Sequence, residues 1–174
     1  MATSTFNLDK AHSDVSFSTK HMMVTTVRGK FNAAEGFLNL DIDDPAASSG
    51  SFTVKTASID TGQDQRDGHL RSADFFDAEN FPEMRFTSTK VEPRGRDGYA
   101  VTGDLTIKGV TKPVTLDLRL NQAGMHPLRK TQAVGFTATT RLNRSDYGVT
   151  FLVPAVSDQL DVRIEIEAYV PPKS

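Results

Sequence analysis

The sequence predicts an all-β protein whose strands close into an antiparallel barrel. Three observations support this: apolar and polar residues alternate with a period of two over most of the chain, turn-forming clusters separate the alternating runs, and helical spacing is confined to one short segment. A closed barrel leaves no sheet edge unpaired. A barrel of about eight strands has an interior that is either filled by side chains or able to hold one small ligand.

Length and composition limit the classes of function. The chain has 174 residues, 37% of them hydrophobic and 24% charged, which fits one globular domain spanning residues 1–174. The formal net charge of −2 provides no positive field for a nucleic acid, and the lack of cysteine excludes thiol nucleophiles and cysteine-ligated metals. The N-terminus has no signal-peptide pattern and no apolar run is long enough to span a bilayer, so we expect a cytoplasmic protein without stable membrane insertion.

The first alternating run is the longest. It begins near Val15 and keeps its phase to Phe31, well beyond the mean strand length of about 5–6 residues. We therefore expect one long strand that bends at Gly29 and curves around the barrel. The face of this strand that points into the barrel includes Phe17, His21, Met23, Val27 and Phe31.

The remaining strands follow in order. Alternation predicts them around residues 38–42, 52–54, 84–86, 99–107, 114–120, 134–142 and 160–170. In the last of these, Leu160, Val162 and Ile164 fall on one face, while Asp161 and Arg163 fall on the other. One face is therefore expected to be buried and the other solvated. The turn-forming clusters lie at residues 43–50, 93–98, 108–111 and 121–127.

The segment Asp64–Asp77 departs from this rhythm. Its apolar positions 70, 73 and 76 fall three apart, which predicts one to three helical turns with Asp64 or Asp67 as the N-cap. Four phenylalanines lie in or shortly after the segment: Phe75, Phe76, Phe81 and Phe86. They form either a satellite hydrophobic cluster or a lid over one mouth of the barrel.

The residues that could carry chemistry do not form a catalytic constellation. Histidine occurs only at positions 12, 21, 69 and 126, and no metal-ligand spacing, nucleophile elbow or nucleotide-binding motif is present. Residues 12–14 read His-Ser-Asp, but adjacent residues on a strand cannot converge on one substrate. His21 shares the apolar face, where it is either satisfied by a neighbouring strand or contacts a ligand head group. Arg66 and Arg71 flank the helical segment and could meet an anion.

Seven stretches, in order along the chain, carry a resemblance to a known family. They are Leu8–Phe17, Lys20–Phe31, Ser58–Thr61, Arg66–Asp77, Phe81–Ser88, Gly103–Val114 and Arg144–Val149. Together they resemble the YceI-like, or polyisoprenoid-binding, proteins over nearly the whole chain.

The resemblance implies an eight-stranded antiparallel, lipocalin-like barrel with one or two short helices. It also implies an apolar interior that binds a long isoprenoid lipid, such as a polyprenyl phosphate or an isoprenoid quinone, and a homodimer. We expect storage, transport or sequestration of that lipid, with no enzymatic activity, cofactor or metal. The alternatives are an enzyme that uses His21 as an acid or base on the bound lipid, and a ligand-free, stress-related interaction protein.

The expected ligand contacts follow from the inward faces and the helical segment. The expected cavity residues are Phe17, His21, Met23, Val27, Phe31, Leu70, Phe75, Phe76, Phe86, Leu105 and Phe136. The expected head-group contacts are His21, Arg66 and Arg71.

Overall fold

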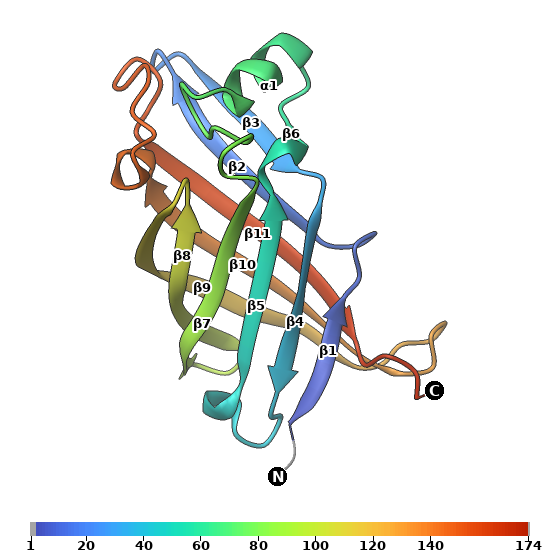
Figure 1. The fold of residues 1–174 in the computed structure, drawn as a ribbon. Coiled ribbons are helices and arrows are strands. Elements are labelled where there is room, and N and C mark those ends of the chain that lie inside the picture. Colours follow the sequence, from blue (N-terminus) through green and yellow to red (C-terminus); the bar gives the residue numbers. More distant parts are fainter. Residues whose placement is uncertain (1–2, 174) are drawn as a thin grey trace.

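In the computed structural model, which describes residues 3–173, eleven strands form one antiparallel sheet, accompanied by one α-helix and three short 3-10 helices (Figure 1). The strands are β1 (Ser4–Leu8), β2 (Asp14–His21), β3 (Thr25–Phe31), β4 (Ala34–Leu40), β5 (Ser49–Lys55), β6 (Ile59–Asp60), β7 (Glu83–Arg94), β8 (Gly98–Ile107), β9 (Val110–Met125), β10 (Gln132–Asn143) and β11 (Gln159–Tyr169). The helical elements are η1 (Pro45–Ala47), η2 (Thr56–Ser58), α1 (Asp64–Arg71) and η3 (Arg144–Tyr147).

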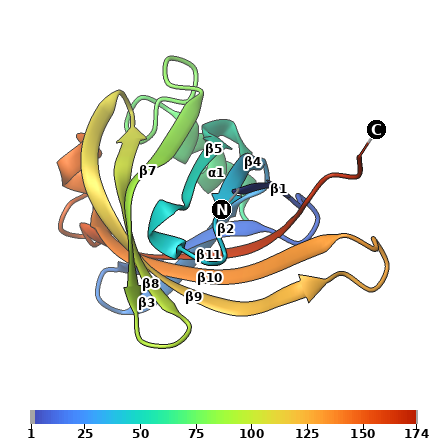
Figure 2. The same ribbon diagram turned by 90° about the horizontal axis from the view of Figure 1, so that it is seen from below.

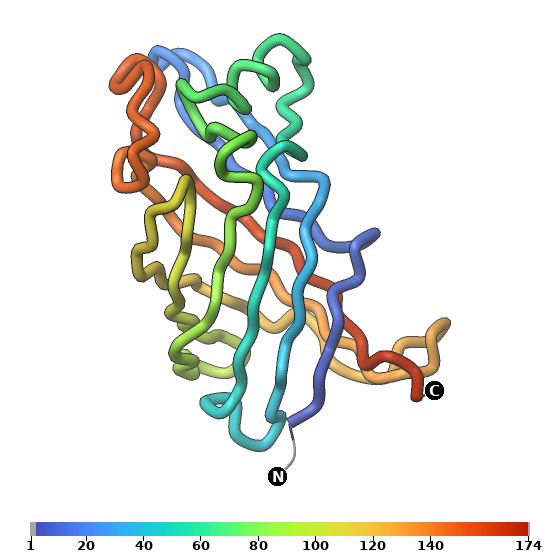
Figure 3. Tube along the Cα trace, in the orientation of Figure 1, coloured from blue at the N-terminus to red at the C-terminus, as the bar shows by residue number. Residues whose placement is uncertain are grey.

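Eight of the strands close into a ring. They follow the order β1-β4-β5-β7-β8-β9-β10-β11, and β1 returns to β11 through Asn7↔Tyr169 and Leu8↔Ala168. The other half of β11, Asp161–Glu165, pairs with β2 instead, so the chain turns sharply between β1 and β2 (Figure 3). The strands β2, β3 and β6 extend the sheet beyond the ring. The prediction of an eight-stranded antiparallel barrel is confirmed.

Alternation along the strands explains which side chains fill the barrel. The ladder between β10 and β11 runs without a break from Ala133↔Tyr169 to Asn143↔Gln159. On β11, Ile166 and Ala168 face inward and are 4% and 0% exposed, whereas the side chain of Arg163 is 62% exposed on the outer face. The face predicted from period two is therefore the buried one.

The prediction of one continuous strand from Val15 to Phe31 is wrong. A turn at Met22–Val24 divides the run into β2 and β3, and both Met22 and Met23 have positive φ, at 51° and 57°. The pairs His21↔Thr25 and Val15↔Phe31 join odd-numbered residues to odd-numbered residues. Both strands therefore point their odd-numbered residues to the same face, and the alternation continues through the turn without a change of phase. Periodicity alone could not reveal it.

Gly29 serves close packing and not a bend. It lies opposite Phe17 in the β2–β3 ladder, and a Cβ atom at position 29 would lie 2.5 Å from Cζ of that ring. Only glycine leaves room for the aromatic side chain here.

The helical segment forms as predicted, but its N-terminus differs. Helix α1 is preceded by Gln63 as the N-cap, and neither Asp64 nor Asp67 caps it. The Asp67 side chain is buried and accepts hydrogen bonds from the backbone N–H, at 2.9 Å, and the hydroxyl of Thr61. This carboxylate therefore ties the helix to the chain that enters it. Among residues 3–173, no helix has both the length and the apolar character needed to cross a bilayer.

Candidate ligand-binding cavity

Two apolar chambers occupy the barrel interior. The first chamber, about 150 Å³, lies at the end that carries η1, and the second chamber, about 110 Å³, lies at the end that carries α1. Ile42 and Pro45 line the first chamber from the loop that carries η1. The other apolar lining residues come from seven strands of the ring: Leu38, Leu40, Phe52, Phe86, Val91, Val101, Leu116, Leu118, Leu120, Ala123, Val134, Phe136 and Ile166. Such a surface suits a hydrocarbon.

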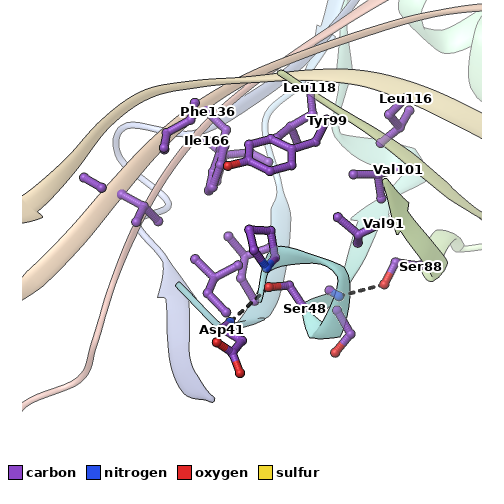
Figure 4. A pocket seen from close by; sticks show the side chains of 18 of the residues that line it. Asp41, Ser48, Ser88, Val91, Tyr99, Val101, Leu116, Leu118, Phe136 and Ile166 are labelled. Atoms are coloured by element: carbon purple, nitrogen blue, oxygen red, sulfur yellow. Dashed lines mark hydrogen bonds between the residues drawn. The ribbon is translucent and has the colours of Figure 1, made fainter. Parts of the chain in front are cut away.

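The polar groups at the mouth of the first chamber hold the loop that crosses it. The Asp41 carboxylate accepts the backbone N–H groups of Asp43 and Asp44 at 3.0 and 2.9 Å. The Ser48 hydroxyl accepts the N–H of Asp41 at 3.0 Å, and the Ser88 hydroxyl accepts the N–H of Gly50 at 2.8 Å (Figure 4). These bonds fix the η1 turn at this end of the ring, which faces the viewer in Figure 2.

Tyr99 is a polar residue that stands among the apolar side chains of the first chamber. It stands on the inward face of β8, and Figure 4 shows its ring among apolar neighbours such as Leu118, Phe136 and Ile166. Within residues 3–173, its hydroxyl makes no hydrogen bond to another group of the protein. The alternation in the sequence places Tyr99 on an apolar β face. It does not identify Tyr99 as a polar contact, because an aromatic ring at such a position is typical of a hydrophobic core.

The second chamber is closed by the segment that follows α1. Phe76 from this segment lines it, and the Phe76 ring meets Phe31 edge to face, with centroids 6.0 Å apart at 82°. The remaining apolar lining is Val15, Phe17, Phe52, Val54, Met84, Phe86, Leu105, Ile107, Leu116, Leu142, Leu160, Val162 and Ile164.

The structure brings six of the predicted cavity residues to the chambers. Five line the second chamber: Phe17, Phe31, Phe76, Phe86 and Leu105. Phe136 lines the first chamber, and Phe86 lines both. Val27 and Leu70 are half-buried but line neither chamber. Phe75 is buried in a separate cluster with Tyr147 and Val149.

The predicted inward positions of His21 and Met23 are wrong. His21 ends β2 and is exposed, and Met23 lies in the following turn with 79% exposure. Because the chain reverses at Met22–Val24, these residues lie past the rim of the barrel instead of inside it.

The two predicted head-group arginines are engaged elsewhere. Arg66 donates to the hydroxyl and the carbonyl oxygen of Thr61 at 2.7 and 2.8 Å. Arg71 donates to the carbonyl oxygens of Ala57 and Ile59 at 2.9 and 3.1 Å. Both side chains therefore fasten α1 to the preceding chain, and neither lines a chamber.

A third arginine organises the α1 end of the barrel. Arg144 is 7% exposed and donates to four backbone carbonyl oxygens, those of Val149, Phe151, Val156 and Ser157, at 2.8 to 3.0 Å. Burial lowers the pKa of Arg144, and the nearby charge of Asp158 opposes that shift. The neighbouring Tyr147 is 2% exposed, and its burial, with the charge of Asp146, raises its pKa to about 12.

Comparison with known proteins gives the family. The family model described as YceI-like domain matches residues 6–168. The chain belongs to the YceI-like family. A UPF0312 protein of Staphylococcus epidermidis is 38% identical, with 84% of this chain and 82% of that relative covered. A UPF0312 protein of Vibrio vulnificus is also 38% identical and covers 90% of this chain and 82% of its own length.

Solved structures share the barrel of this YceI-like protein. BcnA of Burkholderia cenocepacia superimposes with a TM-score of 0.84 at 27% identity, over 92% of this chain and 98% of that one. The YCEI protein of Campylobacter jejuni superimposes with a TM-score of 0.78 at 30% identity, over 88% of this chain and 90% of that one. A polyisoprenoid binding domain from Saccharophagus degradans gives 0.75 over 95% and 98%, but at 16% identity it supports the fold alone.

One group of potential metal ligands lies outside the chambers of this YceI-like protein. Ligand atoms of Asp9, His12 and Glu167 lie within 4.8 Å of one another where β1 meets β11. Asp9 already accepts a charged hydrogen bond from Arg129 at 2.7 Å. Although burial alone would raise the pKa of Asp9, the hydrogen bonds from His12, Ala11 and Arg129 hold it below its usual value. This arrangement fits an ion-pair network that closes the barrel better than a cation site.

Proposed function

We propose that this YceI-like protein binds a long-chain isoprenoid lipid inside the barrel, for storage, transport or sequestration. The observation that carries the proposal is the pair of apolar chambers, whose lining is formed almost entirely by aliphatic and aromatic side chains. Transfer of an isoprenoid chain from water to such a surface lowers the free energy of the system. The shared barrel of a polyisoprenoid binding domain from Saccharophagus degradans agrees with this proposal at the level of the fold.

The charges around the chambers favour an uncharged head group. Asp41 and Arg85 are the charged residues on the chamber linings among residues 3–173. The Asp41 carboxylate already accepts hydrogen bonds from backbone N–H groups. The Arg85 side chain is exposed, and its Nη2 atom lies 3.5 Å from Oε2 of Glu83. A phosphate inside would therefore be desolvated without a cation. An isoprenoid quinone fits better, because the Tyr99 hydroxyl can donate to its carbonyl oxygen.

Binding without catalysis agrees with these side chains. The enzyme alternative required His21 to act on the bound lipid, but His21 is exposed and lines neither chamber. The ligand-free alternative required a fully packed interior, whereas both chambers leave open volume. The cytoplasmic location and the homodimer stay predictions, to be tested by fractionation of the host cell and by light scattering.

Thermal melting with added lipid tests the proposal. A long-tailed quinone at a hundredfold excess over its dissociation constant stabilises the folded state by about 2.7 kcal/mol, so the wild type should melt higher. Phe76→Asp places a charge on the wall of the second chamber and should lose most of that increase. Phe151→Asp makes the same change at the same end of the barrel but outside both chambers, so it should keep the increase. Absence of any shift for the wild type with long isoprenoids contradicts the proposal.

A further inference from the structure

Three side chains stand between the two chambers. Phe52 from β5, Phe86 from β7 and Leu116 from β9 line both of them. Phe52 and Phe86 are direct partners in the β5–β7 ladder, and their rings stack with centroids 6.4 Å apart and planes at 25°. We call these three residues the partition.

The partition limits what the closed barrel can hold. The first chamber has about 150 Å³ and the second about 110 Å³. A cavity of about 150 Å³ in a protein core accepts a molecule the size of benzene, which is close to one isoprene unit. One chamber therefore holds about one unit, and a longer chain reaches from one chamber into the other only by passing through the partition, while its remaining units extend out of the barrel mouths.

The two rings of the partition differ in their freedom to move. Phe86 is 7% exposed and lies against Gly103, where a Cβ atom would come within 2.5 Å of its Cζ. Phe52 also borders both chambers and lies near Gly36, where a Cβ atom would come within 3.0 Å of its Cδ1, but it is only half-buried and is therefore the less tightly enclosed ring. A gate at this position requires a change of the Phe52 χ1 rotamer that breaks its stacking on Phe86.

We infer that Phe52 is an internal gate, which holds the chambers apart in the unliganded barrel and must swing aside when a long isoprenoid enters. This inference rests on the proposed function. It makes the gate a determinant of chain length: ligands of one isoprene unit bind within a chamber, while long ones bind slowly because the ring has to move first.

The test is the rate at which the protein takes up solanesol, a long isoprenol, measured by native mass spectrometry at timed intervals after mixing. Phe52→Ala removes the gate and should accelerate uptake by about tenfold or more. Uptake of prenol, which carries one isoprene unit, is followed by NMR titration and should stay close to that of the wild type. Phe136→Ala is the matched control, because it deletes the same kind of ring from the wall of the first chamber but is not one of the three partition residues.

The outcomes separate the gate from the proposed function. Faster solanesol uptake by Phe52→Ala but not by Phe136→Ala supports the gate. Equal rates for Phe52→Ala and the wild type overturn the gate but leave lipid binding intact. Failure of the wild type to bind either isoprenol overturns the proposed function itself. Should Phe52→Ala melt below the assay temperature, Phe52→Leu keeps most of the volume without the flat ring and decides by the same comparison.

Discussion

The hydroxyls of Tyr99 and Tyr147 both lack a hydrogen bond to other groups within residues 3–173, but their surroundings differ. Tyr147 is buried among Phe75 and Val149, with its hydroxyl sealed from solvent. Tyr99 borders the open volume of the first chamber. The same chemical group is therefore an energetic cost in one place and a potential ligand contact in the other.

Replacement of Tyr99 by Phe should leave the unliganded protein as stable as the wild type, because no protein hydrogen bond is lost. The affinity for a long-tailed quinone should fall by roughly 3- to 10-fold, the value of one net hydrogen bond. Titration calorimetry with the quinone measures this change, and an isoprenoid hydrocarbon without oxygen serves as the control ligand. Equal quinone affinities for the variant and the wild type would show that this hydroxyl does not contact the head group.

Replacement of Tyr147 by Phe should stabilise the protein. The hydroxyl is buried without a partner, so its removal relieves a desolvation cost, and we expect the free energy of unfolding to rise by about 1 kcal/mol. Urea denaturation measures the change. A loss of stability would mean that the hydroxyl has a hydrogen-bond partner, such as a bound water.

At the scale of elements, most strands and the turns near residues 43–50, 93–98 and 108–111 were predictable. In contrast, β1, the β2–β3 turn and the loop held by Arg144 were not, and residues 121–125, predicted as part of a turn, continue β9. The strand β11 follows from alternation alone, because one face is buried and the other solvated. The β2–β3 turn was hidden because it preserves parity and has no glycine, proline or asparagine in Met22–Val24. The loop held by Arg144 was also hidden, because its carbonyl partners are spread over residues 149–157 and carry no side-chain pattern.

The two faces of β11 should respond in opposite ways to the same substitution. Ile164→Asp places an unpaired carboxylate against the clusters of the barrel interior and should lower the free energy of unfolding by about 3 kcal/mol or more, or prevent folding. Arg163→Asp changes the neighbouring residue on the exposed face and should cost about 1 kcal/mol or less. Chemical denaturation of the two variants measures the contrast. Similar losses from both would contradict the assignment of the faces.

At the scale of the whole molecule, alternation predicted the inward faces but not the shape of the space between them. Phe17, Phe31 and Phe136 could be placed on the chamber walls from parity alone. The division of the interior by Phe52 and Phe86 could not, because it depends on the register of β5 against β7 and on the room left at Gly103. Nor did the sequence reveal that Arg66 and Arg71 donate hydrogen bonds to backbone carbonyl oxygens.

We propose that the interior of this YceI-like barrel holds an isoprenoid lipid. Organic extraction of the protein purified from its own host, followed by mass spectrometry, tests it most directly. We predict a long-chain isoprenoid in amounts approaching one molecule per barrel, with an uncharged head group, and a reduced amount from Phe76→Asp. Recovery of the wild type with no lipid, or with lipids that contain no isoprenoid chain, would contradict the account.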